Sequence, residues 1–405
     1  MAYKQNTGWR RAMMRSKFGW MFTVCGTGLC GSVALATLQF EDPDGPGAYV
    51  VFAANDLGMH CMQQDNSELH ILPPFNTVHA QVIKRGNNPD IIKNESEFTI
   101  EYVIPSNTRS ADKTNFWTYA QALYGVVLPP DVGLTGNGMS GTMSYTGNGD
   151  HAVTGIPITP IDDNLRENPY PLATITVKKQ GQVVAQTQTT VPVSWEINCN
   201  LCHNEPGKTL GQMVLPIHDA NHGTSLVGNE PILCASCHAD PAIGATGQLG
   251  VSTFSSAMHS SHAPHMGAVS YLNESCYACH PGIRTQCQRD IHLANNVTCT
   301  DCHGSMKAVG NPARTPWVDE PRCGSCHQRP GFDFEEPGKL FRESRGHGDV
   351  TCLSCHGSPH AITPTLTETD NLQALVHQGH PGKIDSCTVC HTVQPGEPFF
   401  HRRED

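Results

Sequence analysis

The stretch that decides the fold reads Cys352-Leu353-Ser354-Cys355-His356, two cysteines three residues apart followed at once by a histidine. The chain of 405 residues contains this Cys-x-x-Cys-His motif seven times, and 14 of its 18 cysteines belong to it. The motif cysteines are Cys199, Cys202, Cys234, Cys237, Cys276, Cys279, Cys299, Cys302, Cys323, Cys326, Cys352, Cys355, Cys387 and Cys390. The motif histidines are His203, His238, His280, His303, His327, His356 and His391.

The spacing within the motif has a chemical reason. Two thiols three residues apart can add to the two vinyl groups on one edge of a haem, and the adjacent histidine then coordinates the haem iron. A single copy would be moderate evidence for such a site. Seven copies predict seven covalently attached haem c groups, held by the motif cysteines and ligated by the motif histidines.

Three other uses of paired cysteines explain the motif less well. Zinc ribbons also contain Cys-x-x-Cys pairs, but zinc gives no reason for a histidine directly after every second cysteine. Thioredoxin-like redox pairs occur singly, on a βαβ scaffold that this segment lacks. A disulfide framework would not keep the same two-residue gap in all seven pairs. The repeated histidine therefore favours haem.

The motifs also limit the kind of fold that can hold them. They occupy 193 residues, from Cys199 to His391. This is about 28 residues for each haem, too few to build a conventional side-chain core. We therefore predict a heptahaem cytochrome c domain over 196–405, with short helices and loops, little regular structure and closely packed haems.

Histidines outside the motifs are candidates for the second axial ligand. The chain has 22 histidines, and eleven of those outside the motifs follow His203. His218/His222 and His259/His262 have the spacing of one helix face and could reach two adjacent irons. The candidates for bis-histidine ligation are His218, His222, His259, His262, His292, His347, His360 and His380. His401, in the charged tail, is expected at the surface.

The first half of the chain has the pattern of β-strands. Apolar residues occupy every second position in 97–105, which is the period of a half-buried strand. Two further predicted strands, 173–177 and 182–187, flank 178–181 as in a hairpin. This half is long enough for one independent core, so the sequence predicts a β-rich, sandwich-like domain over 37–195.

The N-terminus has the features of an export signal. Residues 1–17 carry five basic residues and no acidic one, an apolar stretch follows, and Ala34-Leu35-Ala36 has the small-x-small form of a cleavage site. We predict a signal peptide over 1–36; an uncleaved membrane anchor is the alternative. Cleavage removes five positive charges and takes the formal charge from −11 to −16.

Charge and hydropathy exclude two classes of partner for the mature chain. It has no cluster of Lys and Arg of the kind that neutralises phosphates, which argues against binding to nucleic acid. No segment after residue 40 is long and apolar enough to cross a membrane. With the predicted signal peptide, the chain is expected to be exported to the periplasm, the cell surface or beyond.

The sequence resembles the exported multihaem c-type cytochromes of metal-reducing and syntrophic microbes. The resemblance lies in the stretch from Gly346 to Ala361, in Asn55-Asp56-Leu57-Gly58-Met59-His60-Cys61-Met62 and in Ile71-Leu72-Pro73-Pro74-Phe75. It implies electron transfer at or beyond the cell surface, with haem c as cofactor and other redox proteins or extracellular acceptors as partners. Some members assemble into filaments, so homopolymerisation is compatible with the resemblance.

Two features of the sequence remain outside this reading. His60-Cys61-Met62, with His70 and His79 nearby, offers ligands that suit copper, although structural packing or donation of a histidine to a haem explains the triplet better. Cys61 and Cys287 are the two cysteines left over in the mature chain, and a disulfide between them could tie the two halves together.

The main functional hypothesis is an exported electron carrier with a chain of seven haems, rather than an enzyme. One alternative is a multihaem reductase of a small nitrogen or sulfur oxyanion, which needs one haem with an open sixth position. No motif departs from Cys-x-x-Cys-His, so the sequence does not mark a specialised haem. The other alternative is a subunit of a conductive filament.

Overall fold

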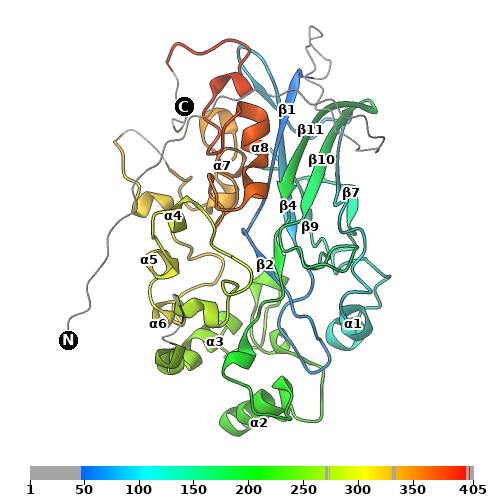
Figure 1. The fold of residues 1–405 in the computed structure, drawn as a ribbon, viewed down its shortest axis with the longest axis vertical. Helices are drawn as coiled ribbons and strands as arrows, with labels where there is room; N and C mark the ends of the chain where they lie inside the picture. Colours follow the sequence, from blue (N-terminus) through cyan, green and yellow to red (C-terminus); the bar gives the residue numbers. More distant parts are fainter. Residues whose placement is uncertain (1–46, 270–271, 273, 331–333, 398–400, 402–405) are drawn as a thin grey trace, which may run out of the picture. The chain divides into compact units, whose positions relative to one another are not determined.

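The computed structural model describes residues 47–269, 272, 274–330, 334–397 and 401. All of these described residues belong to one compact unit. The predicted signal peptide lies outside the described residues. Strands dominate up to Ser194, and short helices and loops follow, so the expectation of β-sheets together with short helices and little regular structure is confirmed (Figure 1).

Two antiparallel sheets share one core. The first contains β1 (Tyr49–Asn55), β4 (Thr77–Lys84), β9 (His151–Thr154) and β8 (Ser144–Tyr145), with β5 (Asp90–Ile92) paired to β4. The second contains β11 (Gln182–Thr190), β10 (Leu172–Lys179), β6 (Phe98–Val103) and β7 (Ser140–Thr142). Val51 of β1, Val82 of β4 and Ile175 of β10 are fully buried in this common core. Apolar residues at every second position thus line the space between the sheets.

The predicted hairpin forms with longer strands than expected. β10 and β11 pair through Lys179 and Gln182, leaving only Gln180 and Gly181 as the turn. Both turn residues have positive φ, 49° and 82°, as the type I′ turn of a two-residue hairpin requires. Lys178 and Lys179, which the sequence places in the loop, are therefore strand residues.

The five-stranded sheet is covered on both faces. All seven residues of β1 are buried. Val51 and Ala53 point into the core between the sheets, whereas Val50 and Phe52 pack with Val389 of the last motif. A strand buried on both faces shows no alternation of apolar and polar residues, and Tyr49–Asn55 has none.

Short elements complete the fold. Two small parallel ladders join distant parts of the chain: β2 (His60–Cys61) pairs with β12 (Val193–Ser194), and β3 (Leu69–His70) pairs with β13 (Ile232–Leu233). The α-helices are α1 (Phe116–Tyr124), α2 (Leu210–His222), α3 (Phe254–His262), α4 (Ile291–Ala294), α5 (Cys299–His303), α6 (Met306–Val309), α7 (Cys352–His356) and α8 (Glu368–Gln378). No helix among the described residues is long and apolar enough to span a membrane.

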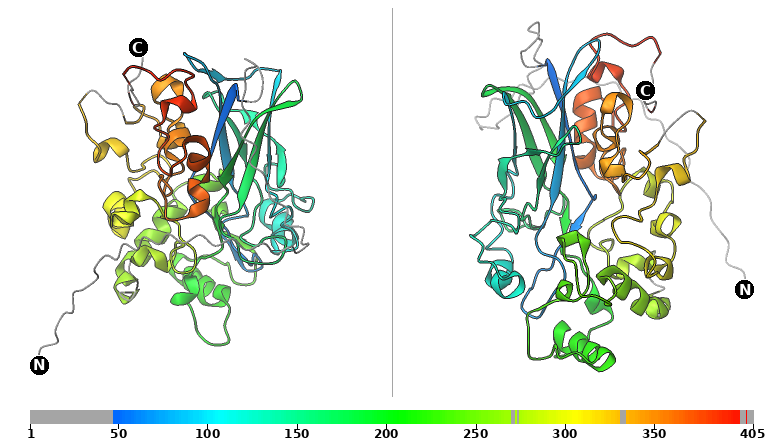
Figure 2. Two further views of the ribbon diagram at one scale, coloured as in Figure 1. Left: turned by 45° about the horizontal axis from the view of Figure 1, so that its top comes forward. Right: turned by 180° about the vertical axis from the view of Figure 1, so that it is seen from behind.

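Side-chain amides attach the last helices to the sheets. Helices α7 and α8 run beside β1 and β11 in both views (Figures 1 and 2). Gln373 of α8 accepts hydrogen bonds from the Ala53 backbone N–H at 2.7 Å and from the Thr187 hydroxyl at 3.2 Å. Gln81 of β4 accepts from the Thr351 N–H at 2.9 Å and the Ser354 hydroxyl at 3.0 Å, both at the start of α7.

A buried arginine of the second half contacts the first half of the chain. The Arg289 guanidinium, 1% exposed, donates to both carboxylate oxygens of Asp370 at 2.6 and 3.0 Å. It also donates to the Gly58 carbonyl at 2.6 Å and lies over the ring of Tyr170. The cation is therefore paired, hydrogen-bonded and stacked, which is what burial of a charge requires.

We expect Arg289→Met to lower the free energy of unfolding by about 3–5 kcal/mol, because it leaves the Asp370 carboxylate buried without a partner. Lys208→Met is the matched control, since Lys208 pairs with Glu205 at 2.8 Å while both side chains are about half exposed. The control should lose about 1 kcal/mol or less. Urea unfolding of the two variants measures both values, and equal losses would contradict the structural role of Arg289.

Candidate functional site

Each of the seven motifs forms a single helical turn. In four motifs the first cysteine begins a 3-10 turn: Cys199–Leu201, Cys234–Ser236, Cys323–Ser325 and Cys387–Val389. In the third motif the first cysteine is the second residue of the 3-10 turn Ser275–Ala278. In the fourth and sixth motifs it is the first residue of α5 and of α7. In the first motif the N–H groups of Cys202 and His203 both donate to the Cys199 carbonyl, at 3.2 and 2.9 Å. A helical turn brings side chains three and four positions apart to one face, so the two thiols and the imidazole lie together.

Every motif histidine faces a second histidine from elsewhere in the chain. We number the sites 1 to 7 in the chain order of their motifs. The ring pairs, with the distances between centroids, are His203–His262 at 6.5 Å, His238–His218 at 6.2 Å, His280–His259 at 6.1 Å, His303–His360 at 6.0 Å, His327–His292 at 5.9 Å, His356–His401 at 5.8 Å and His391–His347 at 6.1 Å.

These distances fit two imidazoles on opposite sides of one metal ion. A ligating imidazole nitrogen lies about 2 Å from a transition metal. Two rings on opposite sides of the ion therefore have centroids about 6 Å apart. Each of the seven motif histidines has such a partner ring within the described part of the chain.

Hydrogen bonds at Nδ1 leave the other ring nitrogen free in half of these histidines. Nδ1 faces a backbone carbonyl in five of them, a hydroxyl in one and a carboxylate in one. The partners are Ser252 O for His238, Ser255 O for His259, Met258 O for His262, Leu57 O for His360, Asn87 O for His391, the Thr224 hydroxyl for His218 and Asp290 Oδ2 for His292. An imidazole whose Nδ1–H donates presents Nε2 as a lone-pair ligand.

Burial keeps several of the facing imidazoles neutral. Burial, and next the charge of a neighbouring imidazole, lowers the pKa of His280, His303 and His356 to about 4. A neutral imidazole is the form that ligates a metal ion. These three motif histidines are therefore unprotonated at neutral pH.

The structure brings six of the eight predicted second ligands to a motif histidine. Two others, His222 and His380, face none: His222 is exposed and contacts the ring of His218, and His380 is exposed and pairs with Asp385. The place expected for one of them is taken by His401. The position of His401 in the charged tail predicts a surface location, but its half-buried ring faces His356.

No local sequence pattern identifies His401 as a second ligand. His401 lies ten residues after His391, yet its ring faces His356, which belongs to the sixth motif. Helical spacing identified His259 and His262 because both belong to α3. No such short-range pattern connects His401 with His356, so only the path of the chain brings them together.

Adjacent sites can be ordered by contacts between their elements. Sites 1 and 3 share α3, since His262 faces the first motif and His259 the third. The beginning of α3 contacts site 2, where the Phe254 ring lies 6.3 Å from that of His238. Burial, and next the charges of Asp240 and Cys199, raise the pKa of the Cys234 thiol, so the first cysteine of site 1 acts on that of site 2. Site 1 is therefore a neighbour of both site 2 and site 3.

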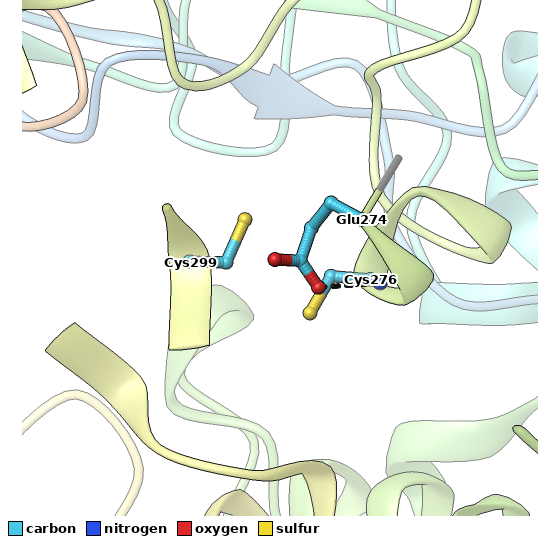
Figure 3. Close-up of side chains that lie close together, drawn as sticks. All are labelled: Glu274, Cys276 and Cys299. Carbon is cyan, nitrogen blue, oxygen red and sulfur yellow. Dashed lines mark hydrogen bonds between the residues drawn. The ribbon is translucent and has the colours of Figure 1, made fainter. Parts of the chain in front are cut away.

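Sites 3 and 4 meet at their first cysteines. The Cys276 and Cys299 sulfurs and a Glu274 carboxylate oxygen lie within 4.8 Å of one another (Figure 3). Both thiols are free in this structure, so the three side chains could also hold a metal ion if the thiols are not used for attachment. A backbone hydrogen bond connects sites 4 and 5. The Val297 N–H, two residues before α5 of site 4, donates to the carbonyl of His292, the second histidine of site 5.

Contacts also connect site 5 with site 6 and site 6 with site 7, so the seven sites form one row. The ring of Phe334 lies 6.2 Å from that of His327 at site 5 and 5.3 Å from that of His401 at site 6. The Ile384 N–H donates to the carbonyl of Cys355, which links site 6 to the segment before site 7. The contacts give the order 2-1-3-4-5-6-7. In Figures 1 and 2 the elements follow the same course, from α2 and α3 through α5 to α7.

The two features left over from the sequence do not gather into a further site. His60 pairs with Asp56, His79 with Asp150, and His70 with Asn66 and Tyr124, so the three rings have separate partners. Cys61 and Cys287 are both free among the described cysteines. Burial, and next the charge of Cys287, raises the pKa of the Cys61 thiol. Cys287 therefore lies near Cys61, and the Cys61 thiol stays protonated at neutral pH.

Comparison with known proteins adds little. No protein-family model and no curated protein matches the chain. Among solved structures, the chain is similar to the crystal structure of MtrC from Shewanella baltica OS185, with 16% sequence identity and a TM-score of 0.14. The alignment covers 81% of this chain and 45% of MtrC, so the chain spans less than half of that protein. At this TM-score the likeness carries no argument.

Proposed function

We propose that this chain is an exported heptahaem c-type cytochrome that carries electrons to another redox protein or an extracellular acceptor. The observation that carries the proposal is the pairing of all seven motif histidines with a second histidine at the separation of two imidazoles on one metal ion. Haem iron would supply one-electron oxidation and reduction at each site.

The residues present fit seven haems. The motif cysteines would form the thioether bonds, the motif histidines would be the first axial ligands, and His262, His218, His259, His360, His292, His401 and His347 the second, for sites 1 to 7. This assignment replaces His222 and His380 by His401. The motif cysteines other than Cys352 are free thiols in the described part of the chain, which leaves them available for attachment.

The contacts favour a carrier over a reductase. A reductase of a small oxyanion needs one iron with an open position, whereas each motif histidine here faces a second imidazole. The order of the sites, with each next to the following one, suits transfer of an electron from neighbour to neighbour. Export and the extracellular acceptor rest on the resemblance and on the predicted signal peptide.

The mature holoprotein should exceed its chain mass by seven haems. Its oxidised spectrum should contain only low-spin haem, and the reduced protein should not bind carbon monoxide, because two imidazoles occupy each iron. Intact-mass spectrometry and a carbon monoxide difference spectrum measure these properties. A mass increase of six haems or fewer, or a high-spin haem that shifts with nitrite, would contradict the proposal, and the latter would favour the reductase.

We expect His401→Ala to create one carbon-monoxide-binding haem per molecule, because it removes the imidazole that faces His356. His380→Ala is the control, since His380 is exposed and its ion-pair partner is Asp385. The control should bind no carbon monoxide. The opposite result, with the new site in the His380 variant alone, would restore the ligand set predicted from sequence.

Asp290→Asn should raise the reduction potential of site 5. The Asp290 carboxylate, 5% exposed, accepts from His292 Nδ1 at 3.0 Å, and a charged acceptor makes the imidazole a stronger electron donor to the oxidised metal. Asparagine keeps an acceptor oxygen but removes the charge. Asp385→Asn, which alters the exposed pair with His380, is the control. A potentiometric titration in which Asp290→Asn and wild type coincide would refute this role.

A further inference from the structure

The N-terminal motif from Asn55 to Met62 begins at the last residue of β1 and includes β2. It is folded against the C-terminal half, where Leu57 and Gly58 contact His360 and Arg289. Gly58 is buried, and a Cβ atom built on it would lie 1.8 Å from the carbonyl oxygen of Pro359. The motif therefore contacts the residue that precedes His360.

His360 has a backbone conformation that an ordinary histidine seldom adopts. Its φ is +60°, in the left-handed region, where a non-glycine residue is held only by its surroundings. Its carbonyl accepts a hydrogen bond from the Arg289 N–H at 2.8 Å. This conformation directs its ring to His303, with centroids 6.0 Å apart and an interplanar angle of 26°.

The N-terminal motif also contacts the His360 ring itself. Nδ1 of His360 lies 3.2 Å from the carbonyl oxygen of Leu57. If Nδ1–H donates to this carbonyl, Nε2 is left to face site 4. The side chain of Arg289 completes the arrangement, because it donates to the carbonyl of Gly58 while its backbone holds His360.

Asn55 fixes the loop that presents these groups. Its Oδ1 accepts hydrogen bonds from the N–H groups of Leu57 and Gly58, and its amide donates to the Thr77 carbonyl at 2.8 Å. Asn55 is fully buried at the end of β1. The five-stranded sheet thus holds the loop, and the loop holds the histidine.

We propose that the Asn55–Gly58 loop is the positioning element for the second ligand of site 4, with Asn55 and Gly58 as positioning residues. This inference rests on the proposed function, since it assumes that His360 ligates an iron. It gives the β-rich half a direct role in building a site in the other half, beyond docking or assembly.

Gly58→Ala in the holoprotein tests the proposal. The added methyl group collides with Pro359, so the loop and His360 must separate, and one haem of seven should become high-spin and bind carbon monoxide. Gly147→Ala is the matched control, because Gly147 has a similar φ of +89° but no atom within 4 Å of its Cβ position. The control should bind no carbon monoxide, and His360→Ala should reproduce the Gly58→Ala spectrum.

Asn55→Ser provides a second test, which adds no collision but shortens the side chain that holds the loop. It should shift the site in the same direction to a smaller extent. Folded Gly58→Ala protein with seven haems and no carbon monoxide binding would overturn the proposal. So would an unchanged Asn55→Ser spectrum if Gly58→Ala does not fold, or an equal change in the control. A wild-type chain without covalent haem would instead refute the proposed function itself.

Discussion

The buried guanidinium of Arg289 is the interaction on which the arrangement of the two halves depends. It joins the Asp370 carboxylate of α8, the Gly58 carbonyl and the Tyr170 ring, while the backbone of the same residue holds His360. A buried charge must have all its donors satisfied, so these partners are fixed relative to one another. Arg289 therefore connects the position of the N-terminal loop with that of His360, a candidate iron ligand.

The β-rich half contacts the row of sites at several points along its length. β3 pairs with β13 directly before the motif of site 2, and Gly86 forms a bridge with His391 of site 7. Gln81 holds the start of α7 at site 6, and Leu57 contacts His360 at site 4. The sheets therefore support a segment that has too few residues per site for a core of its own.

The carbonyls and carboxylate around the imidazoles do more than fix their orientation. Most of the Nδ1 partners are neutral backbone carbonyls, whereas His292 faces the charged Asp290. Because the charge on the acceptor changes the donor strength of the imidazole, chemically identical ligand pairs can have different affinities for an electron. The acceptor at Nδ1 is therefore one feature by which the candidate sites can differ in their affinity for an electron.

The sequence by itself determined the seven Cys-x-x-Cys-His motifs, because two thiols and an imidazole at this spacing are contained in five consecutive residues. It also determined α3 with His259 and His262, whose spacing is that of one helix face, and the strands whose apolar residues alternate. It did not determine His401 as the partner of His356, the order of the sites, or the contact of Gly58 with Pro359. These depend on residues far apart in the chain, and only the packing of α7, α8 and the N-terminal loop against the sheets brings them together.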